Sequence, residues 1–295
     1  MTSPFVRFGR LYNALFFSFS GILALMCLLA FWSCTRPSLA APIPYGDFVG
    51  TTVTYRMVTE DTSSAGDTPP LYGAPTVSGD SLDFNPVGFD SEVSGVNNSD
   101  ITSGQLIFMV EANNKQIDTI RNLHISELGD LTLSGTGTDS TSVSVRLPAM
   151  IEIVEVDGIA IPPIELSMLS TPPLPVLDPM FRLVPSNAAS DGTFQLVTDG
   201  GGGPIYTTQW GGTLFVDLHD ALIQSGTSFQ RGITKINVTM ANILSSTSEA
   251  ETTARIAKKD VDGLTITTNI PEPGTATLAL GAILSGLMLA RRGRS

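Results

Sequence analysis

Serine, histidine and carboxylate side chains are the groups of this chain that could perform catalysis. Ser81 stands in the string GDSL and could act as a nucleophile if a histidine base and an acid came within hydrogen-bond reach. The late histidine, His219, stands in DLHD with Asp217 two residues before it. The simpler interpretation of GDSL is a turn that enters a strand, with Asp80 and Ser81 satisfying local backbone amides.

The string GDSL at 79–82 resembles the block that opens a family of lipases and esterases, and the resemblance implies a nucleophilic Ser81. That family places the block at the end of a buried apolar strand, and it needs later Gly and Asn oxyanion donors and a late Asp-x-x-His. Here GAPTVS precedes the block, and the spacing of Asp217 and His219 differs. We therefore expect a protein that is not an enzyme and name no catalytic residue, with hydrolysis at Ser81 as a remote alternative.

Metal binding has few candidate ligands. His124 and His219 are the two histidines, and their wide separation gives no zinc-binding constellation. The strings DLHD at 217–220 and KDVDG at 259–263 offer carboxylates, but neither has the spaced oxygen ligands and final Glu of an EF-hand. We expect no cofactor and name no metal site; a calcium ion between loops of an acidic body is the alternative left open.

Two groups of residues could act on a sugar. Glu152, Glu155 and Asp157 alternate with apolar residues, and a glycosidase needs two carboxylates that face each other across a cleft. A solvated strand face explains their spacing more simply. Trp210 and Tyr206 could stack on a sugar ring. Since Trp210 is the one tryptophan of the body, we expect it to pack in the core.

Strands must position these groups, because apolar and polar residues alternate with period two in many segments. β-Branched residues and Thr dominate the segments, while Gly, Asn, Asp and Ser fill the gaps. The predicted strands are 47–60, 106–112, 130–135, 142–147, 151–158, 213–218, 235–240 and 263–268. Segments 219–224 and 250–259 are each short or polar enough to be a single helical turn or another strand.

This pattern predicts an all-β body over residues 41–268, an antiparallel β-sandwich that is jelly-roll-like. Six prolines crowd the segment 162–179, which no central strand could accept. We therefore expect a long connection or a sheet-edge cover there.

The body is acidic and lacks cysteine. Six of the 16 Lys and Arg residues and one of the 28 Asp and Glu residues lie outside 41–270, which leaves 10 bases against 27 acids and a formal charge near −17. Such a balance argues against nucleic acid as a partner. Both cysteines, Cys27 and Cys34, precede the body, so the body cannot form disulfides.

Residues 1–40 have the order of a secretory signal peptide. Arginines precede an apolar stretch at 11–34, and RPSLAAP then offers a cleavage site between Ala40 and Ala41. The stretch approaches the ~20 residues that span a bilayer, so an uncleaved anchor is one alternative. A lipoprotein at Cys34 is another. In each case we expect export.

The C-terminal segment 269–295 combines three features in a fixed order. These are a Pro271-Glu272-Pro273 motif, an uncharged and mostly apolar segment at 275–290, and the arginines Arg291, Arg292 and Arg294. A helix over 275–290 would rise about 24 Å, short of a hydrocarbon core about 30 Å thick, so we expect a marginal transmembrane helix. The arginines would act as the membrane stop on the cytoplasmic side. The prolines favour an extended, accessible motif.

This tail resembles the PEP-CTERM sorting signal of bacteria that pair an exosortase with exopolysaccharide production. The resemblance implies recognition of Pro271, Glu272 and Pro273 by the exosortase, transient membrane insertion, and transfer to the cell surface or extracellular matrix. The expected function is that of a non-enzymatic structural or adhesive component of the biofilm. Its expected partners are the exosortase, the secretion machinery and exopolysaccharide. The alternative is a carbohydrate- or calcium-binding β-sandwich.

Overall fold

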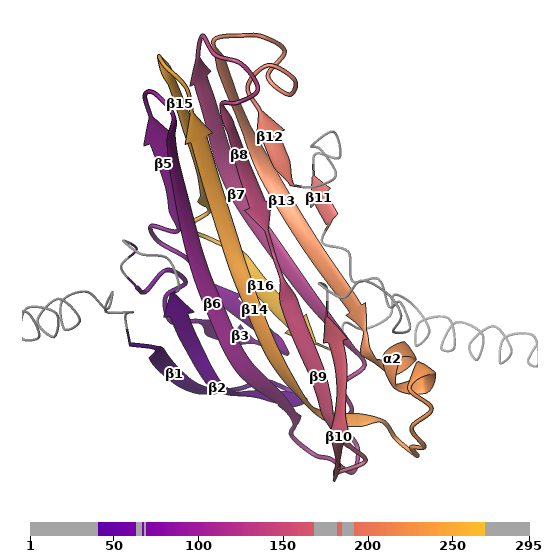
Figure 1. Cartoon of the computed structure of the whole chain (residues 1–295). Helices are drawn as coiled ribbons and strands as arrows, with labels where there is room; N and C mark the ends of the chain where they lie inside the picture. The colour runs from indigo at the N-terminus through magenta and orange to yellow at the C-terminus, as the bar shows by residue number, and fades with distance from the viewer. Residues whose placement is uncertain (1–40, 63–66, 68, 168–181, 185–191, 269–295) are drawn as a thin grey trace, which may run out of the picture. The chain divides into compact units, whose positions relative to one another are not determined.

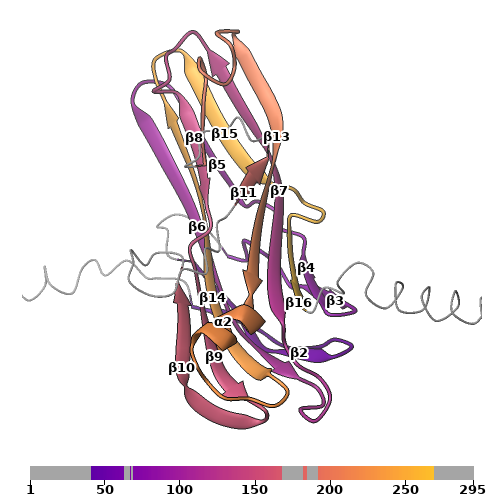
Figure 2. The same ribbon diagram turned by 90° about the vertical axis from the view of Figure 1, so that its right-hand side faces the viewer.

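Two antiparallel β-sheets make up the part of the chain that the computed structural model describes, residues 41–62, 67, 69–167, 182–184 and 192–268 (Figure 1). The two sheets lie as two layers, as the view turned by 90° shows (Figure 2). The predicted all-β antiparallel sandwich is therefore confirmed for the body. The predicted signal peptide up to Ala40, the sorting motif, the helix at 275–290 and the terminal arginines lie outside the described residues.

Sheet A has the strand order β1-β2-β6-β14-β8-β12, with β9 paired to β14 and β10 paired to β9. Its strands are β1 (Ile43–Val49), β2 (Val53–Thr62), β6 (Asn98–Ala112), β8 (Ser142–Arg146), β9 (Ala149–Val156), β10 (Ile159–Ser167), β12 (Thr193–Gln195) and β14 (Ile233–Ser248). All of its pairings are antiparallel.

Sheet B has the order β11-β13-β7-β16-β4-β3, with β15 paired to β7 and β5 paired to β15. Its strands are β3 (Thr76–Ser78), β4 (Ser81–Phe84), β5 (Asp90–Ser94), β7 (Asn122–Gly135), β11 (Arg182–Val184), β13 (Ile205–Asp217), β15 (Thr252–Lys258) and β16 (Leu264–Thr268). The helix α2 (Leu218–Gln224) directly follows β13.

The core lies between the sheets and follows from the period-two alternation. In β14 the even-numbered residues from Ile236 to Leu244 are buried, while the odd-numbered residues from Asn237 to Ile243 are partly exposed. Removing the apolar side chains from water is the main favourable contribution to folding. The phenol of Tyr55 on β2 crosses this core and donates hydrogen bonds of 2.6 Å and 3.2 Å to the carbonyls of Asp80 and Ile266.

Each predicted strand overlaps an observed strand, although the ends differ by a few residues and several observed strands are longer. The segment 47–60 contains the turn between β1 and β2, and the segment 106–112 is the end of the longer β6. Two segments were predicted as either a helical turn or a strand. Segment 219–224 forms most of α2, whereas most of segment 250–259 forms β15. The Asp217 carboxylate caps α2 by accepting a hydrogen bond of 2.9 Å from the Asp220 amide. No helix within the described ranges is both long and apolar enough to span a membrane.

The proline-rich segment begins with a strand, which corrects part of the expected connection. Pro162 and Pro163 lie in β10, which among the described strands pairs only with β9, and the register shifts between Ala160 and Ile164. An edge strand with a bulge tolerates the missing amide donors of proline. The exclusion of these prolines from a central strand was therefore right, while residues 168–181 lie outside the described part of the chain.

Candidate functional site

The side chains of the GDSL string at 79–82 link the turn between β1 and β2 to β4 and β16. The Asp80 carboxylate accepts hydrogen bonds from the amide and the hydroxyl of Thr52 at 2.7 Å and 2.6 Å, so it holds the turn between β1 and β2. The Ser81 hydroxyl lies 2.6 Å from that of Thr267, and Thr267 stands in register between Ser81 and His124. The predicted turn into a strand is confirmed. The expected local amide partners were wrong, because Asp80 binds a turn that is distant in sequence.

Each of the two histidines lies close to an aromatic ring. His124 on β7 is half-buried, and its ring centroid lies 6.5 Å from that of Phe215. Burial lowers the pKa of His124. His219 on α2 packs edge-on against Phe229 at 5.5 Å. Neither histidine is next to Ser81 in the strand register.

The candidate cation-binding strings make structural hydrogen bonds, one local and one between segments that are distant in sequence. Asp217 of DLHD caps α2, and the Asp262 amide in KDVDG donates a hydrogen bond of 3.1 Å to the side chain of Asn85. Among the described residues, no group of three or more His, Cys, Asp or Glu side chains is placed to hold a metal ion.

Trp210 lies in the core, as its sequence context predicted. Its side chain is 1% exposed and covers Gly129, where an added Cβ would lie 2.2 Å from the indole Cε2 atom. Only glycine therefore fits at position 129 beneath the indole. Tyr206 is partly buried and packs against the same core, above Gly200. The sugar-stacking platform considered from the sequence is therefore absent at these two aromatic residues.

The carboxylates of β9 separate into two roles. The Asp157 carboxylate accepts hydrogen bonds of 2.6, 2.7 and 2.9 Å from three consecutive backbone amides, which fixes the chain before β14. Burial raises the pKa of Asp157, but these amide donors outweigh it and the net shift is downward. Glu152 accepts a hydrogen bond of 3.0 Å from Asn237, and Glu155 joins a larger network. The predicted solvated strand face fits the partly exposed Glu152, whereas Glu155 is largely buried.

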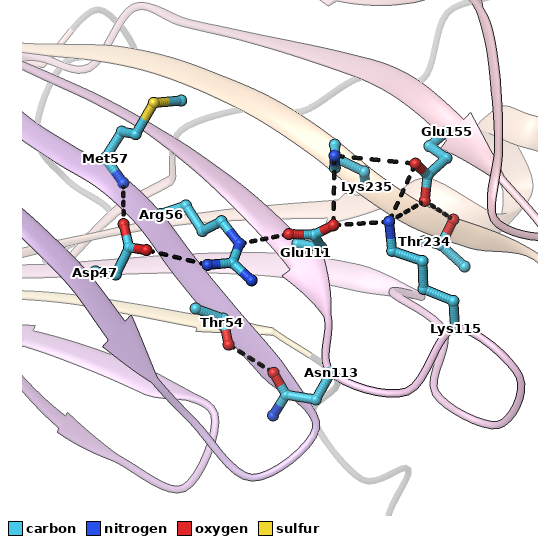
Figure 3. A network of polar contacts seen from close by, with 10 residues as sticks. All are labelled: Asp47, Thr54, Arg56, Met57, Glu111, Asn113, Lys115, Glu155, Thr234 and Lys235. Atoms are coloured by element: carbon cyan, nitrogen blue, oxygen red, sulfur yellow. Dashed lines mark hydrogen bonds and ion pairs between the residues drawn. The ribbon is translucent and has the colours of Figure 1, made fainter.

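A polar network crosses five strands and the loop that carries Lys115 on the outer face of sheet A (Figure 3). We call it the charge ladder, and its charged members are Asp47, Arg56, Glu111, Lys115, Lys235 and Glu155. Three acids and three bases alternate in it, so it is formally neutral. It uses three of the ten basic residues of residues 41–270, which leaves the rest of that region strongly acidic.

The distances within the charge ladder are those of direct ion pairs. Arg56 lies 3.0 Å from Asp47 and contacts Glu111 on its other side. The Lys115 ammonium bridges Glu111 at 2.7 Å and Glu155 at 2.9 Å. The Lys235 ammonium lies 3.4 Å from the Glu111 carboxylate and 3.9 Å from the Glu155 carboxylate. Every charge thus faces an opposite charge, and the arrangement ties β1, β2, β6, β14 and β9 together.

Strand register and one bulge create the charge ladder. Lys235 on β14 pairs with Glu111 on β6 and with Glu155 on β9, so the three side chains stand in one row. The register of β9 then shifts, because Ile236 pairs with Ile153 rather than with residue 154. Regular alternation would place Glu152 and Glu155 on opposite faces. The extra residue of the bulge brings both to the outer face.

Sequence reasoning named only Glu155 among these residues. Their partners come from strands far apart in the chain, so no local spacing reveals them. One sequence signal could have pointed to these partners, namely the scarcity of basic residues in the body. Lys235 is a single base in an alternating strand of this acidic body, so a carboxylate neighbour was to be expected.

The charge ladder predicts a dependence of stability on acid. Burial raises the pKa of Glu111, but hydrogen bonds from Lys115 and Arg56 and the charge of Lys235 outweigh it and lower the pKa from 4.5 to about 2. A lowered folded-state pKa stabilises the fold above the unfolded pKa, and this contribution is lost as the pH falls from about 4.5 to about 2. Glu111→Gln should therefore lower the urea midpoint at pH 7, and the gap from the wild type should shrink over that window.

Glu165→Gln on the edge strand β10 is the matched control, because Glu165 is exposed. Its urea midpoint at pH 7 should differ little from that of the wild type. A Glu111→Gln gap of equal size at pH 7 and at pH 2 would contradict the assignment.

Comparisons with known proteins do not assign the chain to a family. No protein family and no curated protein matches the sequence. Among solved structures, the chain is similar to a carbohydrate-binding module specific for non-crystalline cellulose, CBM28, with 9% identity and a TM-score of 0.20 over 72% of this chain and 80% of that chain. It is also similar to the enzymatically active domain of bacteriophage CBA120 tailspike protein 4, with 10% identity and a TM-score of 0.14 over 61% of this chain and 19% of that one. Similarities with TM-scores this low support neither a shared fold nor a shared function.

Proposed function

We propose that the protein is an exported, exosortase-sorted component of the cell surface or extracellular matrix, with a structural or adhesive rather than an enzymatic role. The observation that carries the proposal is the ordered tail: the Pro271-Glu272-Pro273 motif, the apolar segment 275–290 and the terminal arginines. A stub of this length spans a bilayer only marginally, which suits transient insertion followed by processing. The apolar leader at the other end supplies the export signal.

The described body supports a mechanical role. Its carboxylates bind other parts of the body: Asp80 and Asp157 fix turns, and Glu111 and Glu155 join strands. Antiparallel strands with both sheets closed over one core resist local opening. The acidic surface keeps such a protein soluble outside the cell.

The carbohydrate-binding alternative relied on Trp210 as a residue that stacks on a sugar ring, but Trp210 lies in the core. The esterase alternative requires a base beside Ser81, whereas the Ser81 hydroxyl binds Thr267. Neither alternative has a described residue that favours it, so we do not advance them.

Replacing the motif by alanine tests the proposal in producing cells. We expect wild-type protein to be recovered outside the cell without its C-terminal arginines, as intact mass would show. Pro271→Ala combined with Glu272→Ala and Pro273→Ala should leave most of the protein in the membrane fraction with Ser295 still present.

Thr275→Ala combined with Thr277→Ala is the matched control, because it changes neighbouring uncharged residues and keeps the motif. This variant should be released like the wild type. The proposal fails if extracellular wild-type protein ends at Ser295 and the motif variant is distributed identically.

A further inference from the structure

Four polar side chains in the core make no aligned hydrogen bond. Glu127, Asn242 and Lys258 have buried polar atoms without a hydrogen-bond partner, and so does the indole nitrogen of Trp210. The Lys258 ammonium lies 2.9 Å from the Glu127 carboxylate, and both side chains are fully buried. Neither polar atom of the Asn242 carboxamide has a hydrogen-bond partner in good geometry. Since buried polar groups are nearly always paired, an amine, an acid and a carboxamide left together require an explanation.

A short connection joins β14, which carries Asn242, to β15, which carries Lys258. β14 ends at Ser248 in sheet A, and β15 begins at Thr252 in sheet B, so the short turn carries the chain across the core. Asn242 precedes the end of β14 by as many residues as Lys258 follows the start of β15. Both side chains point inward. Facing sheets are about 10 Å apart, a gap that the long lysine stem largely spans.

Aromatic rings connect the two sides of this cluster. The Lys258 ammonium lies 5.5 Å from the centroid of Phe89. Gly104, the register partner of Asn242, faces the same ring, because an added Cβ there would lie 2.9 Å from it. The Tyr72 phenol donates a hydrogen bond of 2.8 Å to the Gly104 carbonyl. Asn242 and Lys258 thus share one water-excluded aromatic compartment.

The Tyr72 phenol interacts with both Glu127 and Asn242. Burial raises its pKa, the charge of Glu127 raises it further, and contact with the Asn242 side chain lowers it. Burial likewise lowers the pKa of Lys258, and the Glu127 charge only partly opposes this. A low-polarity compartment thus favours transfer of the ammonium proton to the adjacent carboxylate. The product of that transfer is a neutral amine, which is a nucleophile.

We propose that Lys258 and Asn242 form an intramolecular isopeptide bond between the two sheets, with Glu127 as the proton-transfer group. Glu127 takes a proton from the ammonium, and the freed Nζ attacks the Cγ carbon of Asn242. The new N–C bond forms as the bond from Cγ to Nδ2 breaks. Glu127 carries protons from the attacking nitrogen to the leaving one, which departs as ammonia. No oxidant or other reactant is needed.

This cross-link would suit a body that has no cysteine for disulfides. It would also remove the burden of a buried charged pair, because the product contains a neutral amide beside a carboxyl group that can donate to it. The inference does not depend on the proposed sorting, since it concerns only residues of the described core.

Mass spectrometry of the purified full chain tests the proposal. The folded wild type should be about 17 Da lighter than its sequence predicts after terminal processing, the mass of one ammonia. Trypsin should yield the segments 236–255 and 256–259 as one branched peptide, because acylated Lys258 is no longer a cleavage site. Fragmentation should place the branch between Lys258 and Asn242.

Asn242→Ala, Lys258→Arg and Glu127→Gln should each abolish the branched peptide. Asn237→Ala is the matched control, because Asn237 lies on the same strand and binds Glu152 on the outer face, and it should keep the branch. The wild-type measurement decides the matter even if a variant fails to fold. Folded wild type with a linear 236–255 peptide, at its sequence mass or deamidated at Asn242, would overturn the proposal.

Discussion

Trp210→Ala is expected to lower the free energy of unfolding of the body by about 3–5 kcal/mol, the usual loss for a buried large aromatic side chain. The indole is 1% exposed and fills the space above Gly129. Since no side chain at Gly129 can replace it, truncation leaves a cavity between the sheets. Urea unfolding followed by far-UV circular dichroism would measure the loss.

Phe215→Ala is the matched control for Trp210. Phe215 lies on the same strand, β13, but its side chain is 51% exposed. Its removal should therefore cost less than about 1 kcal/mol, which is typical of surface substitutions. A Trp210→Ala protein as stable as the Phe215→Ala protein would contradict the core assignment and revive a binding role for the indole.

Glu60→Ala is expected to cost about 3–5 kcal/mol, because hydrogen bonds to a buried charged acceptor are among the strongest in a fold. Glu60 on β2 is fully buried. It accepts hydrogen bonds from the amide of Leu71, from the amide of Tyr72 at 3.2 Å and from the hydroxyl of Tyr45 at 2.6 Å. Alanine leaves these donors without a partner, so the loop at 71–72 should detach from the sheet. Hydrogen exchange at those two amides would report the detachment directly.

Glu92→Ala is the corresponding control. The Glu92 side chain is 55% exposed and lies 3.4 Å from Arg255 on the surface. Surface ion pairs of this kind contribute about 0–1 kcal/mol. Glu60→Gln should fall between the two alanine variants, since its amide oxygen can still accept one hydrogen bond. Equal losses for Glu60→Ala and Glu92→Ala would show that the buried contacts of Glu60 contribute little.

The two polar networks illustrate why stability in this body depends on long-range contacts. The charge ladder joins residues of five strands and one loop on the outer face, whereas Glu60 joins β2 to the loop at 71–72 inside. Partly exposed pairs such as Arg56 with Asp47 are screened by water and salt. We therefore assign the larger stabilisation to the buried acceptor and the pH dependence to the charge ladder.

The sequence by itself determined the strands and the class of the fold. Alternation is a local property, so the segments at 130–135 and 235–240 showed which side chains face the core before any partner strand was known. The core position of Trp210 was predicted from composition, because it is the one tryptophan of the body. The acidic balance of the body and the absence of cysteine from it are likewise properties of composition alone.

The tertiary structure alone decided which strands are neighbours. It placed Asp80 beside Thr52, it turned Glu155 to the outer face through a bulge, and it buried Asn242 and Lys258 in strands of two different sheets. Alternation gives the face of a side chain but contains no information about its partner. The partner depends on the pairing register of strands that are distant in sequence, and this register is set only when both sheets close over a common core.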